Sequence, residues 1–152
     1  MPYFRPYPFE LTPIGKIWAA ERKPMPSASP AYPDHDREYT LELDAVFYEG
    51  CFGLDTISHL TVLYWLRDAD RSVLKSNPPD GGDSIGIFAS LSEDRPNPIG
   101  LGTATIIRIE KNLIHVRGCI DCQSGSTLLD LRPRFLWQTG ISETILPLDA
   151  ST

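Results

Sequence analysis

The sequence of 152 residues contains little that would mark a membrane or secreted protein. No apolar run approaches the roughly 20 residues that a membrane-spanning helix needs, and residues 1–6 lack the basic and apolar blocks of a signal peptide. Only three cysteines occur, and an odd number argues against a disulfide framework. We therefore expect a cytoplasmic protein with no membrane partner and with buried or half-buried free thiols.

The chain also lacks the patterns of a nucleotide-binding α/β protein. No G-x-G-x-x-G follows a strand, strands and helices do not alternate regularly, and no long amphipathic helix or internal repeat is present. What remains is a series of short strands separated by turn signals, in a chain that is 41% hydrophobic and 22% charged. Length and pattern together predict a single all-β domain, a β-barrel or sandwich with short helical turns and proline-rich loops.

The expected elements follow from apolar periodicity and turn residues. The proline-rich stretches 1–12 and 22–36 and the segment 76–83 are expected to be loops. The best hairpin joins two strands through Glu110–Asn112. The apolar run 60–66 predicts a strand covered on both faces. The expected strands are 14–20, 40–46, 60–66, 85–90, 103–109, 113–117, 128–131 and 134–137, with a short helix or turn within 49–59.

A zinc site is expected to be absent. Cys119 and Cys122 form one C-x-x-C pair with His115 nearby, but structural zinc sites usually draw on two such pairs. We therefore expect no metal.

The net charge of −6 fits poorly with a nucleic-acid partner. Residues 95–137 nevertheless carry six basic side chains against three acidic ones, so they are locally positive. Two interpretations stay open for this segment: a solvated face, or a modest track for phosphates. The basic residues are Arg95, Arg108, Lys111, Arg117, Arg132 and Arg134.

The most informative stretch is Arg95–Gly100, which reads RPNPIG. The two prolines hold Arg95 and Asn97 out of helical geometry, and Gly100 permits close backbone approach. We expect a stiff, extended ledge that presents a guanidinium and a carboxamide to a ligand. A surface turn with prolines at its corners is the alternative.

This stretch resembles the signature of the TsaA-like family, also called YaeB-like or TrmO-like. Further family-like pieces occur in the family's order, at 13–17, 53–54, 58–60, 86–89, 121, 125 and 129–133. Characterised members methylate N6-threonylcarbamoyladenosine in tRNA with S-adenosylmethionine. The resemblance implies a dimeric β-barrel, with an N-terminal arm at 1–12, the barrel domain at 13–137 and a tail at 138–152.

The resemblance also implies where the cofactor binds. Alternatives stay open: Arg67 and Asp68 could form a surface ion pair, Asp121 could shape a turn, and Leu91 and Leu101 could belong to the core. The implied cofactor contacts are Arg67, Asp68, Leu91, Arg95, Asn97, Gly100, Leu101, Gly118, Cys119, Ile120 and Asp121.

Methyl transfer to nitrogen needs an in-line arrangement and a group that accepts a proton. Asp130 and His59 are the candidate bases, and Arg132 and Arg134 the candidate acceptor contacts. An apolar setting would raise the pKa of Asp130 toward neutrality. We slightly favour an ion pair of Asp130 with Arg132, and a structural hydrogen-bonded role is the alternative for His59.

Several positions depart from the family pattern. The family usually has Arg at Leu91 and Ser at Gly102, and it differs at Arg67 and Asp68 and at three later positions, Ser124, Thr127 and Arg134. The favoured function is N-methylation of a modified adenosine in tRNA. Two alternatives are methylation of a small molecule and a non-catalytic module that binds S-adenosylmethionine.

Overall fold

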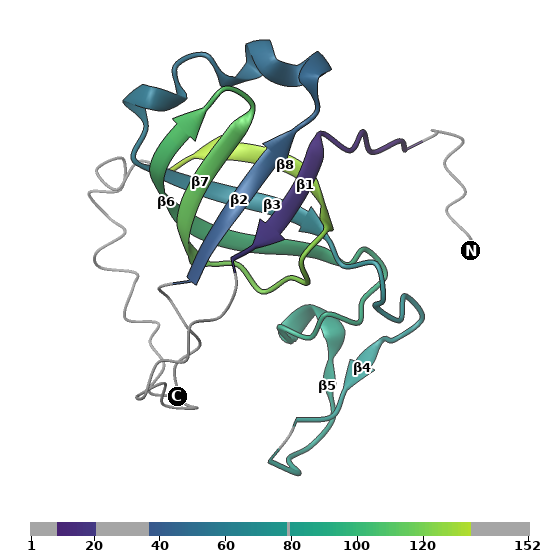
Figure 1. Ribbon diagram of the computed structural model, residues 1–152. Helices are drawn as coiled ribbons and strands as arrows, with labels where there is room; N and C mark the ends of the chain where they lie inside the picture. The colour runs from purple at the N-terminus through teal and green to yellow at the C-terminus, as the bar shows by residue number, and fades with distance from the viewer. Residues whose placement is uncertain (1–8, 21–36, 79, 135–152) are drawn as a thin grey trace.

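The computed structural model describes residues 9–20, 37–78 and 80–134, and these fold into a closed antiparallel β-barrel (Figure 1). The six barrel strands of this part of the chain follow the order β1–β2–β7–β6–β3–β8, and β8 pairs with β1 to close the cylinder. They are β1 Gly15–Ala19, β2 Arg37–Leu43, β3 His59–Trp65, β6 Ile99–Glu110, β7 Leu113–Cys119 and β8 Ser126–Pro133. The expected all-β barrel is confirmed.

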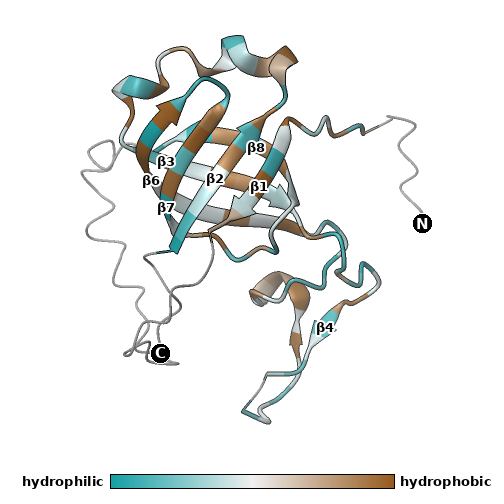
Figure 2. Cartoon of the chain, viewed as in Figure 1, coloured by the Kyte–Doolittle hydropathy of each residue, from teal (hydrophilic) through white to brown (hydrophobic). Residues whose placement is uncertain are grey.

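Side chains that alternate along the strands fill the barrel interior, because successive residues of a strand point to opposite faces. In β3, Leu60, Val62 and Tyr64 face inward and are at most 3% exposed, whereas the residues between them are half-buried. Figure 2 shows hydrophobic and hydrophilic positions alternating along β7 in the same way. The expectation that 60–66 is covered on both faces was wrong, because only the inner face of β3 meets the core.

The predicted hairpin between β6 and β7 is confirmed. Lys111 takes a positive φ of 55° in its tight turn. Asn112 then ties the turn to β2: its side-chain Nδ2 donates to the Leu43 carbonyl at 2.8 Å, and its own carbonyl accepts from the Leu43 N–H at 2.9 Å.

Two predicted strands end earlier in the structure. The segment 85–90 forms only the two-residue strand β5, Ile85–Gly86, which pairs with β4, Lys75–Ser76, and then turns into the 3-10 helix η3, Ile87–Ala89. The Arg95 guanidinium takes the carbonyls of Ile87 and Ser90, so those groups do not join a ladder. The strand predicted through residue 46 likewise ends at 43.

Two more 3-10 helices, η1 Ala45–Cys51 and η2 Leu54–Thr56, cover one end of the barrel (Figure 1). They match the helix or turn expected near 49–59, and Gly53 begins η2 with a φ of 88° that favours glycine. No helix in the described part of the chain is long and apolar enough to cross a bilayer. Of the strand predicted at 134–137, Arg134 lies just after β8, and 135–137 fall outside the described residues.

Between β3 and β6 the chain makes a long excursion, residues 66–98, which projects from the opposite end of the barrel and carries β4 and β5 (Figure 1). Its ends are joined by a hydrogen bond from the Leu66 N–H to the Pro98 carbonyl at 2.9 Å. Arg71 fastens it further: its guanidinium lies 5.3 Å from the centre of the Trp65 ring, and its Nε donates to the Pro96 carbonyl at 2.8 Å. The excursion is therefore anchored to the barrel at the end of β3.

Candidate functional site

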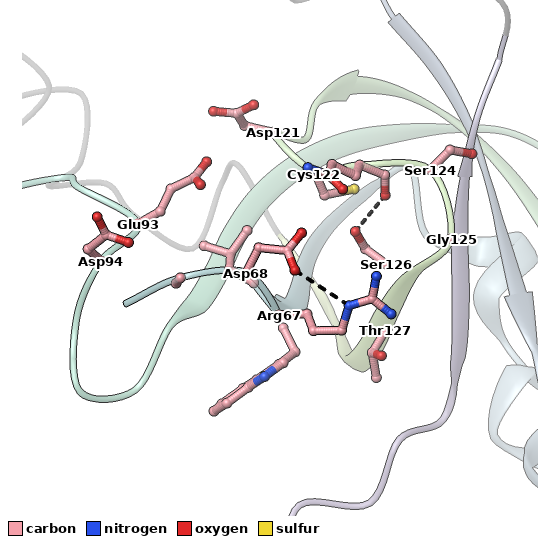
Figure 3. A pocket seen from close by; sticks show the side chains of 14 residues that line it. Arg67, Asp68, Glu93, Asp94, Asp121, Cys122, Ser124, Gly125, Ser126 and Thr127 are labelled. Atoms are coloured by element: carbon pink, nitrogen blue, oxygen red, sulfur yellow. Dashed lines mark hydrogen bonds and ion pairs between the residues drawn. The ribbon is translucent and has the colours of Figure 1, made fainter. Parts of the chain in front are cut away.

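A pocket of 360 Å³ lies where the excursion leaves the barrel. Three segments line it: the end of β3 with the residues after it (65–69), the acidic pair just before the proline-rich signature (93–94), and the connection from β7 to β8 (121–127). Figure 3 shows the polar side chains of these segments around a common space. Its volume is in the range of small-molecule sites, about 300–1,000 Å³.

Strand pairing brings the segments together. β3 and β8 are antiparallel neighbours, so Trp65 lies opposite Thr127. The connection at 121–125 is fixed to β1, because the Gly125 N–H donates to the Ile17 carbonyl at 2.7 Å. The Ser124 hydroxyl accepts from the Ala19 N–H at 3.1 Å. Gly125 itself has a φ of 89°, so a residue with a side chain would be strained there.

The charge of the pocket lining is mainly negative. The lining contains one guanidinium, that of Arg67, and four carboxylates, and the guanidinium contacts the first of these, Asp68, at 3.7 Å. Both partners are exposed, 87% and 69%, so the contact contributes at most about 1 kcal/mol. The carboxylates belong to Asp68, Glu93, Asp94 and Asp121. Such a lining favours a ligand that carries positive charge.

Two buried tyrosines hold the inner wall. The Tyr64 hydroxyl accepts from the Asp121 N–H at 3.1 Å, and the Tyr39 hydroxyl donates to the Ile120 carbonyl. Burial raises the pKa of Tyr64 to about 12. Burial also raises the pKa of Tyr39, and the Arg37 charge opposes that rise. Both phenols therefore stay neutral and keep their hydrogen-bonding capacity at physiological pH.

The cysteines are free thiols, as expected from the sequence: Cys51 is buried, and Cys119 and Cys122 are half-buried. Cys122 lines the pocket, and burial raises its pKa above the usual value. A protonated thiol is a poor nucleophile, so Cys122 serves as a small wall residue. Within residues 9–20, 37–78 and 80–134, no group of three His, Cys, Asp or Glu side chains is arranged to hold a metal.

The signature at 95–100 differs from the predicted ledge. The Arg95 guanidinium is not presented to a ligand: its Nε donates to the Ser92 carbonyl at 3.0 Å, and its Nη2 donates to two further carbonyls of the same loop, Ile87 at 3.0 Å and Ser90 at 2.6 Å. Three carbonyls of one loop give the guanidinium charge-assisted hydrogen bonds, which explains why it turns inward.

Of the eleven residues expected to contact the cofactor, the pocket brings together Arg67, Asp68 and Asp121. Ile120 lies in the core next to Asp121, with 3% exposure. Leu91 and Leu101 are exposed, by 102% and 68%. Residues that do not line the pocket are Leu91, Arg95, Asn97, Gly100, Leu101, Gly118, Cys119 and Ile120.

The two candidate bases also lie away from this pocket. Asp130 forms the favoured ion pair, since its Oδ2 accepts from Arg132 Nε at 3.0 Å, and its Oδ1 accepts from the Leu131 N–H at 2.9 Å. His59 begins β3, and its Nδ1 lies 2.7 Å from the Ser58 hydroxyl. Asp130 instead borders a second, mainly apolar cavity of 590 Å³ beneath η1 and η2. That cavity lies at the far end of β8 from the pocket.

Sequence reasoning missed Glu93, Asp94 and Trp65 as pocket residues. A signal for the acidic pair was available, because it directly precedes the signature. For Trp65 the only signal was its place at the end of a strand, and strand ends do not identify a pocket without the register of the neighbouring strand.

The chain matches the family model described as the tRNA-methyltransferase O N-terminal domain over residues 18–138. A probable S-adenosyl-L-methionine-binding protein of Methanothermobacter thermautotrophicus is 30% identical over 129 residues, which cover 82% of this chain and 89% of that protein. The probable S-adenosyl-L-methionine-binding protein VirR of Rhizobium radiobacter is 37% identical over 94 residues, 62% of this chain and 53% of VirR.

Among solved structures, TrmO from Pseudomonas aeruginosa superposes with a TM-score of 0.67 at 25% identity, covering 92% of this chain and 61% of that one. A second TrmO structure superposes with a TM-score of 0.65 at 26% identity. The chain thus spans about half of VirR and about three-fifths of these solved chains.

Proposed function

Because this chain belongs to the family of the tRNA-methyltransferase O N-terminal domain, we propose that it is an S-adenosylmethionine-dependent methyltransferase. We further propose that its acceptor is a modified adenosine of tRNA, N6-threonylcarbamoyladenosine. Relatives named for binding S-adenosyl-L-methionine support the cofactor, and the family description supports the tRNA acceptor.

The observation that carries the proposal is the acidic pocket at the end of β3. Its lining includes three positions where the family resemblance implies cofactor contacts, Arg67, Asp68 and Asp121. When bound, the cofactor supplies a methyl group activated by a positively charged sulfur. Four carboxylates facing one guanidinium suit that sulfonium and the ammonium group of the cofactor tail. The residues present therefore fit the cofactor.

The chain's own residues then have two tasks. Carboxylates of the lining hold the positively charged donor so that the acceptor nitrogen approaches it in line. The acceptor nitrogen would gain the methyl group as the carbon–sulfur bond of the donor breaks, leaving a neutral thioether, and it would lose a proton. Asp68, Glu93 and Asp121 are the acidic groups in the pocket with exposed positions, so we propose that one of them accepts this proton.

We propose that the acceptor's phosphates meet the outer face of β8. Arg132 is 71% exposed there, and Arg134 follows directly after the strand. The two arginines follow the pocket segment 121–127 by five and seven residues in the sequence. Phosphate contacts of this kind position a nucleic acid without reading its sequence.

We also propose that the protein acts as a homodimer. The outer faces of β3 and β6 expose apolar side chains beside one another: Ile99 is 38% and Leu101 68% exposed, opposite Trp65 and Leu63. Leu91, in the excursion, is a further fully exposed apolar side chain. A second copy of the chain is the occupant implied by the family resemblance.

The first experiment is calorimetric titration of the protein with S-adenosylmethionine, with ATP as the control ligand. Specific micromolar binding, followed by transfer of labelled methyl to tRNA carrying N6-threonylcarbamoyladenosine, is the expected result. Absence of binding by the folded protein contradicts the methyltransferase proposal. Binding without transfer to any acceptor would instead identify a non-catalytic module.

A small-molecule acceptor is the second candidate, and the charge of the pocket favours it. Carboxylates at 68, 93, 94 and 121 repel a polyanion but accept a neutral or cationic metabolite. Transfer of labelled methyl into a metabolite extract, with none into RNA, would decide for this candidate.

A further inference from the structure

The inner wall of the pocket is held from inside the barrel. β7 ends at Cys119, and the next two residues lead into the wall: Ile120 points into the core, at 3% exposure, while Asp121 is exposed and lines the pocket. Tyr39 from β2 and Tyr64 from β3 reach this segment through the core, and both are at most 4% exposed. Neither tyrosine lines the pocket itself.

The two hydroxyls bind adjacent backbone groups of the wall. Tyr64 Oη accepts from the Asp121 N–H at 3.1 Å, and Tyr39 Oη donates to the Ile120 carbonyl. These groups belong to one peptide unit, the link between Ile120 and Asp121. Fixing both sides of one peptide sets its plane, and that plane determines where the Asp121 side chain leaves the backbone.

Gly100 makes room for this arrangement. A Cβ built on Gly100 would overlap the Tyr64 ring, and the ring carbons nearest to it are Cε2, Cζ and Cδ2. Gly102 faces the same way two residues on, and a Cβ there would lie 2.8 Å from the Cys119 carbonyl oxygen. Both glycines are buried on the inner face of β6. The last residue of the RPNPIG signature must therefore be glycine, because a side chain there would overlap the Tyr64 ring.

We propose that Tyr64 is a positioning residue for the cofactor pocket, and that Gly100 is glycine because it seats the Tyr64 ring. The effect passes from Gly100 through Tyr64 to the Ile120–Asp121 peptide and so to a pocket carboxylate. The signature thus acts on the pocket without touching a ligand. This inference rests on the proposed binding of S-adenosylmethionine.

The test is Tyr64→Phe, which keeps the ring and removes only the hydroxyl. Tyr48→Phe is the matched control, because Tyr48 is 41% exposed in η1 at the other end of the barrel. Titration with S-adenosylmethionine should show Tyr64→Phe binding about three- to tenfold more weakly, as expected for one lost hydrogen bond. Tyr48→Phe should bind like the wild type.

Amide hydrogen exchange provides a readout that needs no ligand. In Tyr64→Phe, a peptide covering residues 119–123 should exchange faster, while peptides from β1 and β2 keep wild-type rates. Gly100→Ala should have the same local effect or fold poorly, whereas Gly86→Ala, with nothing within 4 Å of its Cβ, should change nothing.

The outcomes separate the two proposals. If the wild type does not bind S-adenosylmethionine, the proposed function fails. If the wild type binds and Tyr64→Phe binds equally well with unchanged exchange at 119–123, the positioning role of Tyr64 is overturned. A uniform rise in exchange over the whole barrel would also overturn it, because it would show a purely structural role.

Discussion

Among single side chains, Asp121 combines a fixed backbone with a free carboxylate. Its N–H is bound by Tyr64, whereas its side chain faces the pocket. Arg67 and Asp68 lack such a restraint, since their contact is long and exposed. The fold therefore holds the backbone of Asp121 and leaves its carboxylate available to a ligand.

Replacing Asp121 by Asn should weaken S-adenosylmethionine binding about two- to fivefold, because one of four negative charges around a cationic donor is removed. Affinity for S-adenosylhomocysteine, whose sulfur is neutral, should change less. Titrations at 50 and 300 mM salt would measure both. Asp83→Asn, an exposed change outside the pocket lining, is the control, and an equal loss for both ligands would contradict the charge argument.

Tyr64 should also make the folded protein less stable at alkaline pH. Its folded pKa is raised to about 12 from 10.0, so the protonated phenol is favoured in the folded state. The contribution of this phenol to the free energy of unfolding, roughly 2–3 kcal/mol, is fully present below pH 10. It is lost as the pH rises toward 12. Urea unfolding at pH 8 to 11.5 should show a steeper loss for the wild type than for Tyr64→Phe. Parallel slopes would contradict the assignment.

At the scale of elements, Arg95 clamps the later part of the excursion, residues 87–95. Arg95 binds three carbonyls of its own loop, those of Ser92, Ile87 and Ser90. Arg95→Lys keeps the charge but loses the forked geometry. We expect local loosening that corresponds to about 1.5–3 kcal/mol, with little change in the barrel.

Hydrogen exchange would locate that loosening. Peptides covering 85–95 should exchange faster in Arg95→Lys, and β6–β7 peptides should not. Arg67→Lys, at a side chain that is 87% exposed, is the control and should behave like the wild type. Unchanged exchange at 85–95 would show that the clamp is dispensable.

A further prediction concerns the binding of tRNA to the outer face of β8. Arg132→Ala should lower tRNA affinity and reduce the slope of affinity against salt by about one counterion. Arg108→Ala is a matched control: Arg108 pairs with Glu110 two residues on, at the same 3.0 Å as Arg132 with Asp130, and is 59% exposed. Equal effects of both changes would indicate non-specific attraction instead of a phosphate track on β8.

Elements of this chain are predictable where a local pattern decides them. The β6–β7 hairpin follows from alternation around a three-residue turn, and the β3 core from its apolar run. The prediction of a strand at 85–90 was wrong because the Arg95 side chain, which lies outside that segment, binds two of its carbonyls. The same contacts turn the Arg95 guanidinium away from a ligand, contrary to the predicted ledge, whereas Asn97 stays exposed. Local periodicity contains no information about which loop a guanidinium will bind.

At the scale of the whole molecule, the apolar outer faces of β3 and β6 predict self-association. Leu101→Glu should convert a dimer to a monomer, because it places a charge in the apolar surface around Leu101. Light scattering coupled to gel filtration would give the mass. Val46→Glu, at an 80% exposed residue of η1, is the control. A monomeric wild type would contradict the dimer.

The pocket illustrates why a site is harder to predict than a fold. Resemblance pointed to Arg67, Asp68 and Asp121, and the register of β3 with β8 brings them together. The chemistry of methyl transfer pointed to Asp130 and His59 as bases, and the topology puts both away from the pocket. Which of these residues lie together in the pocket depends on how the barrel closes. Closure in turn depends on long-range pairings such as that of β1 with β8.

The hydrogen bond between Leu66 and Pro98 has one more consequence. Because the excursion leaves and re-enters the barrel at adjacent points, its interior can be exchanged as a cassette while β3 and β6 remain paired at Trp65 and Ile99. One wall of the pocket, at 93–94, belongs to the cassette, and the opposite wall, at 121–127, belongs to the barrel. Ligand preference can therefore diverge, in evolution or by grafting, through half of the site while the scaffold is inherited intact.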